Sequence, residues 1–215
     1  NLKKVVIAAL FRRLVAFAGA KGGVGASALA QAAAWGSSDM LQQKTMFVDV
    51  GGGWSTAAVG MGFEPSTTLQ EAVKAAENND EDNLKRMLVT PNERLSILAS
   101  GSDVMLEPTI TPQQIEMLLD TLMAKYPVVI ADLSHAPADL EKVIIARANH
   151  IVTVTTPTLP SLRLARSLIQ EIKDTRGGDI ENVDVIVNMQ GMAPGNEVPK
   201  KDIEDAMDLT VSASI

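Results

Sequence analysis

Short runs of apolar and β-branched residues recur along the chain, and within each run the apolar residues follow one another without alternating polar positions. A strand with one solvent-exposed face alternates apolar and polar residues, whereas a strand that is buried on both faces has a continuous run of apolar residues. The pattern therefore predicts buried strands of a parallel sheet. The runs cover residues 14–18, 46–50, 95–99, 128–131, 151–155 and 183–187, and the residues leading to Ile215 read as part of one more strand.

Helical patterns fill the stretches between these runs. Over residues 112–126, for example, Ile115, Leu118, Leu119 and Leu122 fall on one face of a helix. Strands that alternate with helices are typical of the α/β class. We therefore predict a doubly wound, mostly parallel sheet with helices on both faces. The expected helices cover residues 27–35, 69–76, 83–88, 112–126, 139–148, 161–173 and 199–207.

The pattern predicts one domain over residues 13–215, with no internal repeat and no boundary inside it. We expect this domain to be truncated at its C-terminus. Residues 1–12 are interpreted as a linker from a missing upstream domain. A secretory signal also combines a basic start with an apolar core, but no small-residue cleavage site follows this one.

Composition removes several classes of protein. The 215 residues include no cysteine and two histidines, which excludes disulfide scaffolds, thiolate zinc sites and iron–sulfur clusters. The net charge of −7 argues against a broad basic surface for nucleic acid. No apolar run approaches the roughly 18 residues that a membrane-spanning helix needs.

A glycine-rich segment, residues 19–27, joins the first predicted strand to the first predicted helix. Gly22, Gly23 and Gly25 lie within four residues, between Lys21 and Ser27. Glycines allow backbone N–H groups to wrap an anion, and the N-terminus of the following helix favours negative charge. Ser27 stands where a hydroxyl would ligate Mg²⁺. A tight strand-to-helix turn that needs glycine for packing is the alternative explanation.

The segment Lys-Gly-Gly-Val-Gly-Ala-Ser resembles the deviant phosphate loop of the ParA/MinD-type ATPases, and the resemblance extends from Leu14 to Ile215. Within that family it is most similar to the TadZ/CpaE pilus-assembly branch. Lys21 matches the family's signature lysine, which reaches the phosphates of a partner subunit. The resemblance implies a site for ATP or ADP with Mg²⁺. The loop residues that would bind the nucleotide are Lys21, Gly22, Gly23, Val24, Gly25, Ala26, Ser27 and Ala28.

Three further positions match the family at the ends of predicted strands. The resemblance implies that Asp49 and Asp132 help Ser27 to hold Mg²⁺, that Lys21 and these two aspartates are the catalytic candidates, and that Asn188 recognises adenine. Each also has an ordinary explanation, because aspartate and asparagine are common in turns after strands. His135, just after Asp132, faces either the phosphates or the solvent.

Two positions depart from the family pattern. Ala26 stands where many members have a second lysine, and Gly51 stands where many have an aspartate that orients the attacking water. Lysine in a phosphate loop stabilises the charge that develops during phosphoryl transfer. The resemblance therefore implies that binding and dimerisation are kept while hydrolysis is weak or absent.

We expect an ATP-dependent homodimer that acts in the assembly or polar localisation of a pilus or secretion machine. Its partners would be proteins of that machine, and it would be cytoplasmic, at the periphery of the inner membrane or at a cell pole. Two alternatives stay open: an active partitioning or positioning ATPase of the ParA/MinD kind, and a pseudo-ATPase that binds only proteins.

Overall fold

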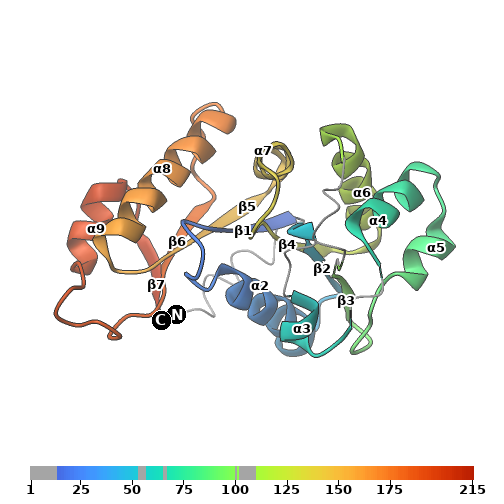
Figure 1. The fold of residues 1–215 in the computed structure, drawn as a ribbon, viewed down its shortest axis with the longest axis horizontal. Coiled ribbons are helices and arrows are strands. Elements are labelled where there is room, and N and C mark those ends of the chain that lie inside the picture. The colour runs from blue at the N-terminus through green and yellow to red at the C-terminus, as the bar shows by residue number, and fades with distance from the viewer. Residues whose placement is uncertain (1–13, 53–56, 65–66, 100, 102–109) are drawn as a thin grey trace.

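A parallel sheet of seven strands forms the centre of the computed structural model, which describes residues 14–52, 57–64, 67–99, 101 and 110–215 (Figure 1). Every pair of neighbouring strands runs parallel. The strand order is β3-β2-β4-β1-β5-β6-β7. The strands are β1 (Leu14–Gly19), β2 (Thr45–Asp49), β3 (Leu95–Leu98), β4 (Val128–Asp132), β5 (His150–Thr155), β6 (Val183–Val187) and β7 (Val211–Ser214).

Helices cover both faces of the sheet (Figure 1). On one face lie α4 (Leu69–Glu77), α6 (Pro112–Lys125), α7 (Ala138–Arg147), α8 (Leu159–Thr175) and α9 (Lys200–Met207). On the other lie α2 (Ala26–Trp35) and α3 (Ala57–Met61). A π-helical turn, η1 (Gly36–Met40), extends α2, and α5 (Glu81–Arg86) lies beside α4. The predicted doubly wound α/β fold is confirmed.

The continuous apolar runs are explained by this two-sided cover. On β2, Met46 belongs to the core under α6 and α7, whereas the next residue, Phe47, belongs to the core under α2. Both side chains are fully buried. Successive strand residues point to opposite faces, so both positions must be apolar when both faces are covered.

The strand order reverses direction at β1. β1 lies between β4 and β5, and the chain builds the sheet first to one side of β1 and then to the other. Ligands of open α/β sheets bind at the carboxyl ends of the strands where this reversal occurs. The glycine-rich segment follows β1 directly and therefore lies at that point.

Local signals in the sequence set where several helices begin. Thr68 and Glu71 form a reciprocal capping box at the start of α4, and Thr111 and Gln114 form another at the start of α6. Each box satisfies N–H groups that a helix end leaves without intrahelical partners. Pro112 occupies the first turn of α6, where its missing N–H costs nothing.

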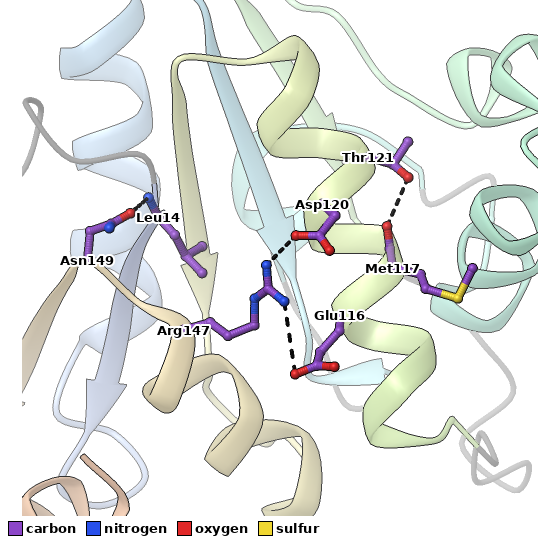
Figure 2. Close-up of polar contacts among 7 residues, drawn as sticks. All are labelled: Leu14, Glu116, Met117, Asp120, Thr121, Arg147 and Asn149. Atoms are coloured by element: carbon purple, nitrogen blue, oxygen red, sulfur yellow. Dashed lines mark hydrogen bonds and ion pairs between the residues drawn. The ribbon is translucent and has the colours of Figure 1, made fainter. Parts of the chain in front are cut away.

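Arg147 ties two helices of one layer together (Figure 2). It lies in the last turn of α7 and pairs with Asp120 and with Glu116, which is 3.9 Å away; both acids belong to α6. Beside this cluster, the side chain of Asn149 accepts a hydrogen bond of 2.9 Å from the N–H of Leu14. These contacts fix the end of α7 against α6 and the start of β5 against β1.

The observed elements match the expected ones within a few residues, with two additions. The C-terminal residues form β7, as the sequence predicted. Helix α3 and the π-helical turn η1 were not predicted. The linker assigned to residues 1–12 lies outside the described residues. No helix of the described part of the chain is long and apolar enough to cross a membrane.

Candidate functional site

The segment between β1 and α2 adopts the backbone of an anion-binding loop. Gly23 and Gly25 have φ values of 78° and 88°, a region that residues with a side chain rarely enter. Gly25 is also the N-cap of α2, and no side chain caps the N–H groups of the first turn. Those N–H groups and the helix dipole are therefore available to an anion at this end of α2.

Asn188, at the end of β6, holds this loop from behind. Its Nδ2 atom donates a hydrogen bond of 2.8 Å to the carbonyl oxygen of Val24. A Cβ atom on Gly25 would lie 2.4 Å from the same Nδ2 atom, so the close approach requires glycine. The structure thus gives Asn188 a contact with the loop backbone, and its expected contact with adenine stays a prediction.

A cavity of about 650 Å³ opens over the loop. Lys21 is the one lysine or arginine among the lining residues that the structure describes. All eight loop residues expected to bind nucleotide lie on its wall. The structure adds residues from α2, α3, α7 and the segment after β4. The full lining is Gly19, Lys21, Gly22, Gly23, Val24, Gly25, Ala26, Ser27, Ala28, Gln31, Gly60, Leu133, Ser134, His135, Ala136 and Glu141.

The two lysine positions of the family pattern differ sharply in this structure. Lys21 is exposed, and its Nζ atom donates a hydrogen bond of 3.3 Å to the carbonyl oxygen of Gly22. Ala26 is buried at the start of α2 and brings no charge. The positive charge of the loop, on Lys21, is therefore exposed at the start of the loop and is absent from its buried end at α2.

Asp49 and Asp132 lie side by side behind the loop. They occupy matching positions at the carboxyl ends of the neighbouring strands β2 and β4, and both are almost fully buried. Asp49 Oδ1 accepts a hydrogen bond from the N–H of Gly51, and Asp132 Oδ1 accepts one from the N–H of Ser134. The structure brings together two carboxylates that lie far apart in the sequence.

The surroundings of Asp49 oppose its charge. The pKa of this carboxyl is raised to about 8, chiefly by burial. The hydrogen bond from Gly51 works against the rise, and the neighbouring Asp132 adds to it. A cation beside the pair would reverse this effect, because opposite charge favours the ionised form.

The oxygen donors of Asp49, Asp132 and Ser27 are of the kind that suits a hard cation. Ser27 lines the cavity over the loop, whereas the two aspartates are not among its lining residues. Two carboxylates and the hydroxyl of Ser27 are ligands that Mg²⁺ prefers, with phosphate and water completing its shell. Among the described residues no group of three or more acidic or histidine side chains could hold a metal alone. By their chemistry, Asp49, Asp132 and Ser27 would suit a Mg²⁺ ion that also contacts a bound phosphate.

The position of Gly51 has no room for a side chain. A Cβ atom there would lie 2.6 Å from the carbonyl oxygen of Ser134. The segments after β2 and β4 thus meet through their backbones, where the family pattern has an aspartate.

The sequence did not single out Gln31 or Glu141. Gln31 lies four residues after Ser27 on α2, so helical spacing alone could have placed it beside the loop. Glu141 is brought in by the packing of α7, which no local pattern reveals. Burial and the nearby Glu171 raise the pKa of Glu141, while Lys142 lowers it.

Solved structures identify proteins that share this fold. A ParA family ATPase from Chlorobium tepidum TLS matches with a TM-score of 0.82 and 22% identity, over 96% of this chain and 84% of that one. The septum site-determining protein MinD of Pyrococcus horikoshii OT3, in complex with Mg-ADP, has a TM-score of 0.75 and 18% identity, over 94% and 80%. A plasmid partition protein from Borrelia burgdorferi has a TM-score of 0.68 and 14% identity, over 94% and 89%.

These identities are low, so the likeness shows the fold alone: this chain has the α/β fold that these ParA, MinD and plasmid partition structures share. No protein-family model and no curated protein matches the chain.

Proposed function

We propose that this protein binds ATP or ADP together with Mg²⁺ at the loop from Lys21 to Ser27. One observation carries the proposal: the cavity over the glycine loop, at the point where the strand order reverses. The paired Asp49 and Asp132 behind the loop support the Mg²⁺ part of it. The Mg-ADP complex of the similarly folded MinD protein is consistent with such a ligand.

We further propose that hydrolysis is slow. Ala26 supplies no ammonium to the transferring phosphoryl group, and the backbone of Ser134 occupies the space beside Gly51. Loss of one group that stabilises developing charge commonly lowers a rate by about 10²–10³. We expect a turnover below about one per second, a low value for enzymes.

The role in the cell that fits these properties is that of a nucleotide-dependent homodimer. Lys21 is exposed, and its side chain makes a long hydrogen bond of 3.3 Å to the carbonyl oxygen of Gly22, so we expect it to exchange this contact for one with a second subunit. The resemblance of the loop to the TadZ/CpaE branch supports a place in the assembly or polar localisation of a pilus or secretion machine. The net charge of −7 makes non-specific binding to nucleic acid unfavourable.

Two alternative functions make different predictions. An active partition or positioning ATPase would bind Mg-ATP and release phosphate rapidly. A pseudo-ATPase would bind neither ATP nor ADP. Equilibrium binding of Mg-ATP and the rate of phosphate release, measured on the same sample, distinguish these two functions from the one we propose. Our proposal predicts tight binding of Mg-ATP and slow release of phosphate.

The binding site is tested by substitution of Gly25. In Gly25→Val, the new side chain would clash with Asn188 and force a strained backbone, so Mg-ATP binding should fall at least about 100-fold. Gly177→Val is the matched control, because Gly177 also has a positive φ, of 64°, and follows α8 away from the cavity. Calorimetry on both variants checks the result. Equal affinity in Gly25→Val and Gly177→Val would place the nucleotide elsewhere.

A further inference from the structure

His135 occupies a turn position with a left-handed backbone conformation. The N–H of Ala136 donates a hydrogen bond of 3.0 Å to the carbonyl oxygen of Leu133, which closes a turn over residues 133–136. The third residue of this turn, His135, has a φ of 62°. Residues with a side chain are uncommon in this region, although asparagine, aspartate and histidine enter it more often than the others. The conformation still costs some free energy, and at a candidate site such a cost favours a functional explanation.

The turn is held against the position that lacks a side chain. A Cβ atom on Gly51 would lie 2.6 Å from the carbonyl oxygen of Ser134 and 3.6 Å from the Cβ atom of His135. The turn thus fills the space that a side chain at position 51 would need. The side chain of His135 therefore starts next to position 51, where the family pattern has an aspartate that orients the attacking water.

His135 also lines the cavity over the glycine loop. Its charged or titratable neighbours on the cavity wall are Lys21 and Glu141. The imidazole is exposed, and among the described residues it makes no hydrogen bond or ion pair. It is therefore available to a ligand or a water molecule in the cavity.

We propose that His135 orients and deprotonates the water that attacks the γ-phosphate of bound ATP, in the place of the carboxylate missing at position 51. This inference rests on the proposed function. The water oxygen forms a bond to the γ-phosphorus as the bond from that phosphorus to the bridging oxygen breaks. The bridging electron pair stays on ADP. The water proton passes to an imidazole nitrogen of His135 and then to solvent. Histidine is suited to this role because it exchanges protons near neutral pH.

Contact between His135 and the bound nucleotide can be tested without ATP hydrolysis. The chain has only two histidines, so His135→Asn assigns both imidazole signals in an NMR spectrum. His150 is the internal control, because it is buried at the start of β5 and hydrogen-bonded to Asp184. Adding Mg²⁺ with a non-hydrolysable ATP analogue should shift the His135 signal and leave the His150 signal in place. An unchanged His135 signal in the presence of bound analogue would overturn the inference.

A test of the chemistry uses variants that relieve the strained turn. His135→Gly and His135→Asn both suit a positive φ, so they should fold at least as well as the wild type. We expect both to bind Mg-ATP normally and to release phosphate at least about 10-fold more slowly, the low end for loss of a general base. Added imidazole should restore turnover in His135→Gly. Gln42→Gly is the matched control, because it relieves a φ of 55° before β2, and it should turn over as the wild type does.

The outcomes separate this inference from the proposed function. A wild type that binds no nucleotide overturns both. A wild type that binds Mg-ATP but releases no phosphate overturns the role of His135 and leaves the binding function intact. Equal turnover in the wild type and in His135→Gly overturns the role of His135 as well.

Discussion

The ionised carboxylate of Asp49 opposes folding. Its pKa of about 8 means that the folded chain holds this proton more tightly than the unfolded chain, where the value is 3.8. Stability from this group is therefore greatest below about pH 4 and is lost as the pH rises to about 8. The charged form of Asp49 is unfavourable in the fold by itself, and the proposed Mg²⁺ ion would make it favourable.

This balance predicts the effect of Asp49→Asn. Asparagine keeps an oxygen that can accept the N–H of Gly51 but carries no charge. In Mg²⁺-free buffer at pH 8, the variant should be more stable than the wild type by about 1–3 kcal/mol, since each pKa unit corresponds to roughly 1.4 kcal/mol and buried groups relax in part. At pH 4 the difference should nearly vanish. Urea unfolding at both pH values measures it.

The control for that experiment is Asp139→Asn, which removes an exposed carboxylate on α7. Its stability should change by less than about 0.5 kcal/mol, as is usual for surface positions. The Asp49→Asn variant should also lose most of the stabilisation that Mg-ATP gives the wild type. If Asp49→Asn is less stable than the wild type at pH 8, the buried carboxylate is well solvated or paired.

At the scale of single elements, the cluster around Arg147 fixes how α7 lies against α6. Arg147 is only 29% exposed and meets two carboxylates, so its removal leaves Asp120 and Glu116 facing each other without a cation. We expect Arg147→Ala to destabilise the fold by about 1–2 kcal/mol, more than a solvent-exposed pair contributes. Urea unfolding at low and high salt tests this.

Lys125→Ala is the comparison, because Lys125 is buried to a similar extent, 33% exposed, but pairs with a single carboxylate, that of Glu81. That change should cost about 0.5 kcal/mol or less. Similar losses in the two variants would mean that Arg147 contributes no more than an ordinary surface residue. Because α7 carries Glu141 and follows the turn of His135, loosening it should also weaken nucleotide binding slightly.

The elements that sequence patterns predicted are those with long apolar runs or strong caps. The run 128–131 could be recognised because both faces of β4 are buried. Helix α3 could not, since its five residues, Ala57–Met61, include a glycine and are too few to show a period. The π-helical turn Gly36–Met40 is made of weak helix formers and is stabilised by a buried contact of 2.6 Å between Ser37 and Thr45.

The same distinction holds for the site. Its glycine loop is continuous in sequence, so spacing alone revealed residues 19–27. The pairing of Asp49 with Asp132 needed the sheet register, and the approach of Ser134 to Gly51 needed the packing of two loops. Local patterns carry no information about such contacts, because they join residues that are distant along the chain.

For the molecule as a whole, the fold gathers its chemistry at one edge of the sheet. The loop after β1, the carboxylates ending β2 and β4, and Asn188 after β6 all lie at carboxyl ends of parallel strands. In the proposed dimer, a second copy covers this edge and encloses two nucleotides at once, and the exposed Lys21 on the cavity wall is expected to contact it.

A symmetric dimer makes each Lys21 contact twice. Each charge-assisted contact between an ammonium and a phosphate contributes roughly 1.5–3 kcal/mol, so losing two should weaken Mg-ATP-dependent dimerisation by about two to four powers of ten. Lys21→Ala should therefore stay monomeric at concentrations where the wild type dimerises, while its monomer still binds nucleotide. Lys85→Ala, which removes an exposed lysine of α5, should dimerise as the wild type does. Sedimentation of the three proteins with and without Mg-ATP measures the effect. Equal dimer fractions for the wild type and Lys21→Ala would make Lys21 a ligand of its own subunit's phosphates and remove it from the interface.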